Sequence, residues 1–191
     1  MKIKLSRRGL ITGAILGIAA LIIPKIWQKS KSPASALANE RERPNFDDEN
    51  LIFFTPDEYI LIYDLAEQII PSEGEDAPGA SDIMLANKID RFIADNLEQD
   101  VQNDIRNFLE TFAAGSDALR GQGFSDLTPE EQREYILFWK NFPSLSLLRG
   151  AFLALKRLII AVYFSTKESW DYIDYGGPLN VYVDPFRGRV L

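Results

Sequence analysis

The sequence predicts an all-α fold, a helical bundle of about five to six helices that ends in an irregular, aromatic C-terminal tail. From residue 56 onward, apolar residues recur three and four positions apart, which places them on one face of an α-helix. Two Thr-Pro pairs followed by acidic residues, at Thr55 and Thr128, have the form of helix N-caps. With 46% hydrophobic residues the chain can bury a core, which excludes a disordered polymer.

The first helix is predicted to begin at Pro56 and to stop at Pro71. Thr55 is its N-cap, Pro56 suits the first helical position, and Glu58 completes a capping box by reaching back to the Thr55 amide. Proline cannot continue a helix, so Pro71 ends it. Its apolar face consists of Ile62, Leu65, Ala66 and Ile69.

Two more helices are predicted in the first two thirds of the chain. The second begins at Ser81, after a turn-rich loop, and its apolar face consists of Leu85, Ala86, Ile89, Phe92, Ile93 and Leu97. The third presents Val101, Ile105, Phe108, Leu109 and Phe112. From Gly115 to Ser125 glycine and polar residues interrupt the pattern, so we expect a break there.

The capping device returns at Thr128-Pro129-Glu130-Glu131 and opens a helix that stops near Pro143. The longest helix is expected over residues 144–165, as the centre of the bundle. Its wide apolar face consists of Leu148, Ala151, Phe152, Leu155, Leu158, Ile159, Val162 and Tyr163. Because Arg149, Lys156 and Arg157 lie within it, a membrane span is not expected.

The C-terminal segment is rich in aromatic residues and turn formers. Four aromatics fall within thirteen residues, namely Trp170, Tyr172, Tyr175 and Tyr182. They either fold back over the bundle as a clasp or form an exposed surface for another protein, since Trp and Tyr dominate protein interfaces. We name Trp170, Tyr172, Tyr175 and Pro178 as candidate partner-interface residues.

Charge divides the chain into a basic N-terminus and an acidic body. Residues 1–38 hold seven basic and no acidic residues, while the remainder holds 14 basic and 28 acidic residues. A basic stretch, an apolar stretch over residues 9–24 and a run of small residues form a targeting signal. Ser6, Arg7, Arg8 and Leu10 resemble the twin-arginine (Tat) export signal, in which an Arg pair precedes a mildly apolar segment. The alternative is that the two arginines are ordinary topogenic charges.

Ala36 and Ala38 fit the small-residue pattern of signal cleavage. Residues 1–38 are therefore a signal peptide or, if uncut, an N-terminal anchor formed by residues 10–27. Residues 39–53 form a polar linker, and residues 54–191 form a single helical domain. In both cases we expect the body in the periplasm, at or near the cytoplasmic membrane.

Composition excludes several chemistries. The chain has no His and no Cys, so thiolate zinc sites, Ser-His-Asp triads, catalytic thiols and disulfides are ruled out. A net charge of −7 argues against nucleic-acid binding. The acidic loop over residues 73–82 could offer oxygen ligands to Ca²⁺, although we favour a solvated turn. We predict no catalytic, cofactor-binding or metal-binding residues, and a hydrolase that uses only carboxylates remains an alternative.

A set of short motifs, behind a signal with Arg7-Arg8, resembles the gluconate 2-dehydrogenase subunit 3 family over most of residues 54–178. In chain order they are Phe54-Thr55-Pro56-Asp57-Glu58, Ala66-Glu67-Gln68-Ile69-Ile70-Pro71, the acidic loop 72–79, Ile89-Asp90-Arg91, Leu127-Thr128-Pro129-Glu130-Glu131, Tyr163-Phe164-Ser165, Trp170 and Tyr175-Gly176-Gly177-Pro178. Their order is more informative than any one of them.

The resemblance implies a small, non-catalytic subunit of a membrane-associated dehydrogenase. In that family the catalytic partner is a flavoprotein of the glucose-methanol-choline oxidoreductase type, which holds FAD, and a cytochrome c subunit usually completes the complex. It implies that the Tat signal of the small subunit carries the folded flavoprotein across the membrane. A free-standing periplasmic helical binding or scaffold protein is the alternative.

Overall fold

The computed structural model describes residues 51–72, 77–143 and 146–177. Within these ranges the regular structure is entirely helical, as predicted. The elements are α2 (Pro56–Ile69), α3 (Leu85–Asn96), α4 (Gln99–Arg120), a 3-10 turn η4 (Phe124–Asp126), α5 (Pro129–Lys140), α6 (Leu147–Phe164) and α7 (Lys167–Tyr172). The export and cleavage predictions (Ser6, Arg7, Arg8, Leu10, Ala36, Ala38) and Pro178 lie outside the described residues.

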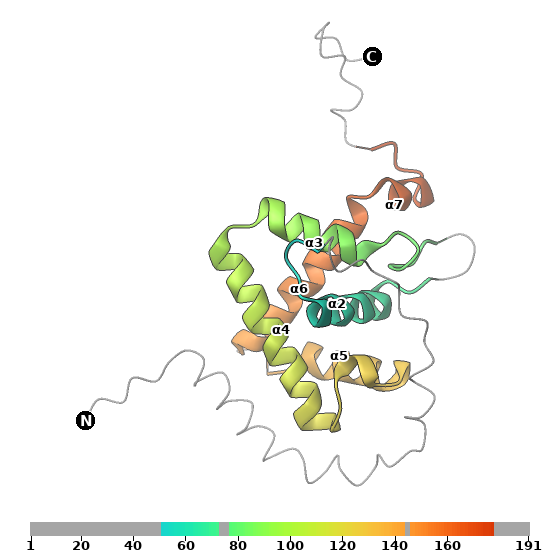
Figure 1. The fold of residues 1–191 in the computed structure, drawn as a ribbon. Coiled ribbons are helices and arrows are strands. Elements are labelled where there is room, and N and C mark those ends of the chain that lie inside the picture. The colour runs from blue at the N-terminus through green and yellow to red at the C-terminus, as the bar shows by residue number, and fades with distance from the viewer. Residues whose placement is uncertain (1–50, 73–76, 144–145, 178–191) are drawn as a thin grey trace, which may run out of the picture.

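Helix α6 is the centre of the bundle, as its wide apolar face predicted, but the prediction that it is the longest helix is wrong, because α6 has 18 residues and α4 has 22. It packs against α3, α4, α5 and α7, and α2 lies against both α3 and α5. Figure 1 shows α6 crossing behind α2, with α4 along one side and α7 at the end that leads to the C-terminus. The buried face of α6 consists of Phe152, Leu155, Ile159, Val162 and Tyr163. Of the described helices, none has the length and apolar character needed to cross a bilayer.

Both predicted capping boxes are present. The Glu58 backbone N–H donates to the Thr55 hydroxyl (3.3 Å), and the Thr55 N–H donates to the Glu58 carboxylate (2.8 Å). The same reciprocal pair joins Thr128 and Glu131, at 3.3 and 3.0 Å. Each box satisfies N–H groups that the first turn of a helix leaves without a partner, so α2 and α5 begin where the sequence predicted.

The start of α3 differs from the prediction, because the helix begins at Leu85 and not at Ser81. Residues 80–84 form a turn in which the Leu85 N–H donates to the carbonyl of Ala80. The Ser81 N–H donates to the Glu67 carboxylate of α2. Met84 closes the turn in the left-handed conformation, with φ 52°, and this conformation cannot be part of an α-helix. A tertiary contact thus delays the helix by one turn.

The predicted break at Gly115 is also wrong, because α4 continues through this residue to Arg120. The helix ends instead at Gly121, which adopts the left-handed conformation with φ 79° that favours glycine at helix ends. Gly115 is buried against α5, where its missing side chain makes room for Tyr135 and Trp139. Gly115 therefore serves close helix packing, and does not stop the helix.

An aromatic cluster fills the space between α4, α5 and α6. Its rings lie 4.9 to 6.5 Å apart, centroid to centroid, around Phe112, and belong to Phe108, Phe112, Phe124, Tyr135, Trp139 and Phe152. The Tyr135 hydroxyl donates to the Phe112 carbonyl at 2.6 Å. Burial raises the pKa of Tyr135 above its ordinary value, because the phenolate would lose its hydration.

Candidate protein-docking surface

The carboxylates considered above as catalytic or metal-binding groups either have structural hydrogen-bond partners or lie too far from one another to form a site. Glu58 and Glu131 are engaged in the two capping boxes. Asp82 accepts the Gly79 backbone N–H at 2.7 Å and so belongs to the turn that precedes α3. In the described part of the chain, no three acidic side chains come together in a way that could hold a metal ion. Residues 73–76, the centre of the candidate calcium loop, lie outside the described residues.

Asp90 is a buried acid whose role sequence reasoning missed. Its side chain is 1% exposed and accepts three backbone N–H groups, from Ile52 (2.8 Å), Phe53 (2.9 Å) and Phe54 (2.7 Å). These hydrogen bonds replace the water that a carboxylate loses on burial. Asp90 directly follows Ile89 and lies on the predicted apolar face of the second helix. An acid at such a position could have indicated a buried carboxylate with hydrogen-bond donors around it.

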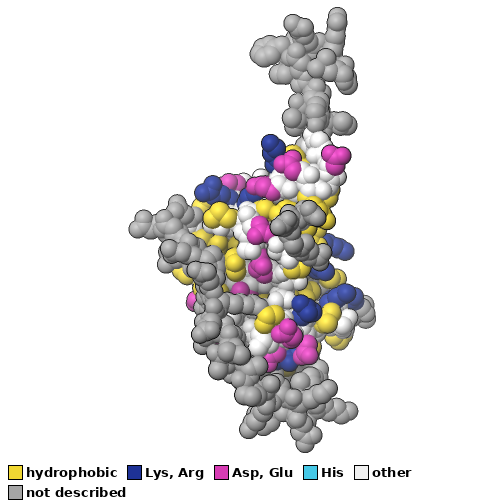
Figure 2. Space-filling model, turned by 90° about the vertical axis from the view of Figure 1, so that its right-hand side faces the viewer, with side chains coloured by type: hydrophobic (Ala, Val, Ile, Leu, Met, Phe, Trp, Pro, Cys, Tyr) yellow, Lys and Arg dark blue, Asp and Glu magenta, His cyan; other side chains and the backbone are white. Residues whose placement is uncertain are grey.

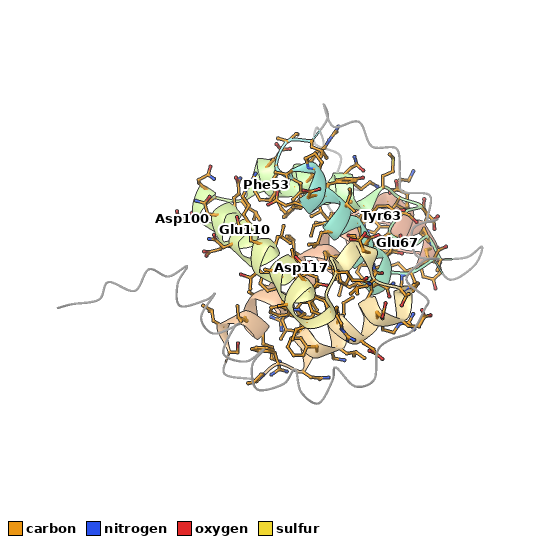
Figure 3. All side chains as sticks on the ribbon, turned by 60° about the horizontal axis from the view of Figure 1, so that its bottom comes forward. Phe53, Tyr63, Glu67, Asp100, Glu110 and Asp117 are labelled. Carbon is orange, nitrogen blue, oxygen red and sulfur yellow. The ribbon has the colours of Figure 1, made fainter. Side chains whose placement is uncertain are left out.

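Arg106 of α4 completes the attachment of the segment that precedes α2. Its guanidinium lies 4.6 Å from the centroid of the Phe53 ring and donates to the Phe53 carbonyl. It also faces the Glu58 carboxylate at 3.8 Å. Figure 3 shows Phe53 beside the start of α2. Asp90 and Arg106, which we call the entry clamp, fix the point at which the linker joins the helical body.

The C-terminal aromatic residues differ in their packing and exposure. The Trp170 indole N–H donates to the Phe164 carbonyl at 2.6 Å, and the Trp170 ring meets Tyr175 edge-on at 5.7 Å between centroids. Gly177, with φ 90°, comes so close that a Cβ atom there would lie 3.2 Å from the Trp170 ring. Trp170 thus packs locally, between the end of α6 and the turn that follows α7.

Beside Trp170, four large side chains remain about half exposed. They are Phe164 (48%), Tyr172 (50%), Ile173 (49%) and Tyr175 (48%), and we call this group the α7 surface. Tyr172 and Tyr175 are two of the predicted interface residues, whereas Phe164 and Ile173 were missed. Tyr163 and Phe164 are neighbours in one helix, so their side chains point in different directions. Because Tyr163 continues the apolar face of α6, Phe164 could have been expected to face outward.

Two contacts hold α7 and the adjoining end of α6 to the rest of the bundle. The Lys88 ammonium of α3 lies 3.0 Å from the Glu168 carboxylate of α7. The Tyr163 hydroxyl donates to the Pro78 carbonyl at 2.9 Å. Burial raises the pKa of Tyr163, and the nearby Tyr172 and Asp82 raise it further. A hydrogen bond from its own backbone N–H, and then Lys88, lower the pKa of Glu168.

Acidic side chains are the majority around the α7 surface. They are Asp82, Glu168, Asp171 and Asp174, against the two bases Lys88 and Lys167. Figure 2 shows carboxylate side chains at the α7 end of the molecule beside apolar ones. The outer face of α4 is acidic as well, with Asp100, Glu110 and Asp117 spread along its length in Figure 3. That second face has no cluster of exposed apolar side chains comparable to the α7 surface.

A protein-family model described as Gluconate 2-dehydrogenase subunit 3 matches residues 56–177. The chain belongs to this family. The match begins at the first residue of α2 and ends at Gly177, so it spans all the described helices and the α7 surface. Members of the gluconate 2-dehydrogenase subunit 3 family associate with the other subunits of such an enzyme. No curated protein and no solved structure gave a match in the corresponding searches.

Proposed function

We propose that this chain is the non-catalytic accessory subunit of a flavin-dependent dehydrogenase complex that oxidises a sugar or an alcohol. The observation that carries the proposal is the family match, which covers the whole described helical body. The catalytic partner is a flavoprotein of the glucose-methanol-choline type, which supplies the FAD. The accessory subunit contributes binding energy, which stabilises and helps to mature its partner, and it takes no part in the bond chemistry.

Export of the partner is the second part of the proposed role. A flavoprotein that acquires FAD in the cytoplasm must cross the membrane folded, and the twin-arginine route carries folded cargo. Arg7 and Arg8 are part of the export signal, and the flavoprotein bound to this chain is exported with it. After export the complex resides in the periplasm, at or near the cytoplasmic membrane, where a cytochrome c subunit can take its electrons.

The entry clamp is consistent with an export signal that is joined to a folded, partner-binding body. Two buried hydrogen bonds to Asp90 and a partly buried one from Arg106 hold Phe53 and Phe54, at the end of the linker, against the helical body. Asp90 and Arg106 lie on α3 and α4, far from Phe53 in the sequence, so the clamp forms only when the body has folded.

Purification from native cells tests the proposal. The chain carries an affinity tag at its C-terminus and is purified under mild conditions, and the visible absorption spectrum of the eluate is recorded. A co-eluting protein with the spectrum of an oxidised flavin supports the accessory-subunit function, and additional haem bands would identify the cytochrome subunit. A colourless, stable single chain would contradict it and favour a free-standing scaffold protein.

A further inference from the structure

We infer that the α7 surface is the docking site for the flavoprotein, and that the matching surface of the partner is an apolar patch bordered by Lys and Arg. This inference rests on the proposed function and adds the location and the chemistry of the contact. It also revises the predicted interface. Trp170, which is partly buried and bonded to the end of α6, is a positioning residue, whereas Phe164, Tyr172, Ile173 and Tyr175 would touch the partner.

The apolar content of the α7 surface supports a protein partner. Single exposed apolar side chains are common on soluble proteins and need no explanation. Here, however, four large ones occur within twelve residues of chain, at a helix end and the turn that follows it. Two of them are tyrosines, which contribute large contact areas at a low cost in side-chain entropy and are frequent interface hot spots.

The backbone beneath these side chains is held in place before any partner binds. The Thr166 hydroxyl accepts the Ser169 N–H at 3.3 Å and caps α7. The Tyr175 N–H donates to the Trp170 carbonyl at 2.9 Å, which folds the turn back onto the helix. With the Trp170 indole bonded to α6, the surface is preorganised, and this reduces the entropy lost on binding.

The charge around the surface favours an occupant with basic groups, a condition that Arg187 and Arg189 of the chain's own C-terminal segment also meet. Because Lys88 and Glu168 neutralise each other in an ion pair, the remaining charges are the three carboxylates of Asp82, Asp171 and Asp174 against the one base Lys167. Asp171 and Asp174 are exposed and have no ion pair within the described chain. Complementary charge accelerates association and rejects partners of the same sign, so a basic border on the flavoprotein fits this site.

Two other occupants are conceivable and make different predictions. The chain's own residues 178–191 begin directly after Gly177 and include the apolar residues Leu179, Val181, Tyr182, Val183, Phe186, Val190 and Leu191. A second copy of the chain could also bury the surface. With either occupant, changes to the α7 surface would alter stability or oligomeric state and leave flavoprotein binding intact.

The test compares the α7 surface with an exposed position at the far end of α6. The tagged full-length chain carries either Tyr172→Ala with Ile173→Ala, two exposed positions of the α7 surface, or Leu147→Ala as the matched control. Leu147 is 81% exposed and lies about 26 Å from Phe164 along the helix. Each variant replaces the native chain in its own cells, and the flavin that co-purifies per tagged chain is measured together with the melting temperature and the oligomeric state.

We expect the wild type and Leu147→Ala to retain the flavoprotein and the double variant to lose it by roughly tenfold or more, with an unchanged melting temperature. Undiminished flavin in the double variant overturns the inference while the proposed function survives. A lower melting temperature with undiminished flavin identifies the tail as the occupant, and a change of oligomeric state with undiminished flavin identifies a second copy. If the wild type itself captures no flavoprotein, the proposed function and the inference fail together.

A charge reversal tests the border of the surface separately. We expect Asp171→Lys to reduce capture at about 50 mM salt and to have a smaller effect at about 500 mM, because salt screens exposed charges. Asp100→Lys, an equal change on the exposed face of α4, is the control and should leave capture unchanged. If the two variants behave alike, the basic border proposed for the partner is wrong.

Discussion

The hydroxyl oxygen of Tyr135 lies 2.6 Å from the point that a Cβ atom on Gly115 would occupy. The two residues fit together only because residue 115 has no side chain. The same hydroxyl donates to the Phe112 carbonyl one turn earlier on α4, so the fit of α4 against α5 depends on this contact. A glycine within a helix costs about 1 kcal/mol relative to alanine, and here the packing of Tyr135 offsets that cost.

Gly115→Ala is expected to destabilise the protein by roughly 1–3 kcal/mol, because overpacking outweighs the gain in helix propensity. In a Tyr135→Phe background the nearest atom to the new Cβ is Trp139 Cζ2 at 3.4 Å, an ordinary contact, so the penalty should largely disappear. Urea unfolding of the four proteins measures the coupling free energy. Equal penalties in both backgrounds would show that Tyr135 does not determine the fit.

The entry clamp is expected to depend on the acceptor capacity of Asp90. Asp90→Ala leaves the buried N–H groups of Phe53 and Phe54 without an acceptor and should cost about 3–4 kcal/mol, whereas Asp90→Asn keeps one oxygen and should cost about 1–2 kcal/mol. Urea unfolding measures both. Hydrogen exchange at the amides of Phe53 and Phe54 should accelerate in the alanine variant.

Asp95→Ala, at an exposed position of the same helix, is the control and should leave both measurements unchanged. If Asp90→Ala is no more harmful than Asp95→Ala, the clamp contributes nothing to stability.

Alkaline pH is expected to destabilise the fold through Tyr135. Burial raises the pKa of Tyr135 in the folded state above the ordinary value of 10.0, so folding disfavours the phenolate. The corresponding contribution to stability is complete below pH 10 and is lost as the pH rises from 10 toward the folded-state pKa. Tyr135→Phe should therefore show a shallower loss of the free energy of unfolding above pH 10. Parallel curves for the two proteins would assign the alkaline loss to other groups.

Export is expected to depend on the arginine pair. Replacing Arg7 and Arg8 with lysine preserves the charge and removes the guanidinium groups, so the precursor and its flavoprotein should remain in the cytoplasm. Replacing Lys2 and Lys4 with arginine is the control, and export should continue. The measurement is cell fractionation with detection of both proteins. Normal export of the Arg-to-Lys variant would rule out a strict twin-arginine requirement.

The helices could be predicted where their signals are local. Thr55 with Glu58 and Thr128 with Glu131 lie within one turn, so their capping boxes can be read from four residues of sequence. The apolar stripe of α6 likewise identified the central helix. The start of α3 and the continuity of α4 could not be predicted, because the relevant contacts, Glu67 with Ser81 and Tyr135 with Gly115, join residues that are 14 and 20 positions apart in the chain.

The segment that forms the candidate docking surface could be predicted from its residue types, but the residues that are exposed within it could not. The density of aromatic residues pointed to the segment around Tyr172 and Tyr175, but their spacing does not reveal which ring packs inward. That depends on the bond from Trp170 to the Phe164 carbonyl and on the turn at Gly177. The role of Asp90 was hidden for the same reason, since its partners lie 36 to 38 residues away in the chain.

We propose that this chain binds a flavoprotein and holds no redox group of its own. The most direct measurement is the ratio of flavin to tagged chain in the particle that elutes from size-exclusion chromatography after purification from native cells. We expect a particle much larger than one chain, with about one flavin per tagged chain supplied by the catalytic partner. A colourless particle with the mass of this chain alone would contradict it.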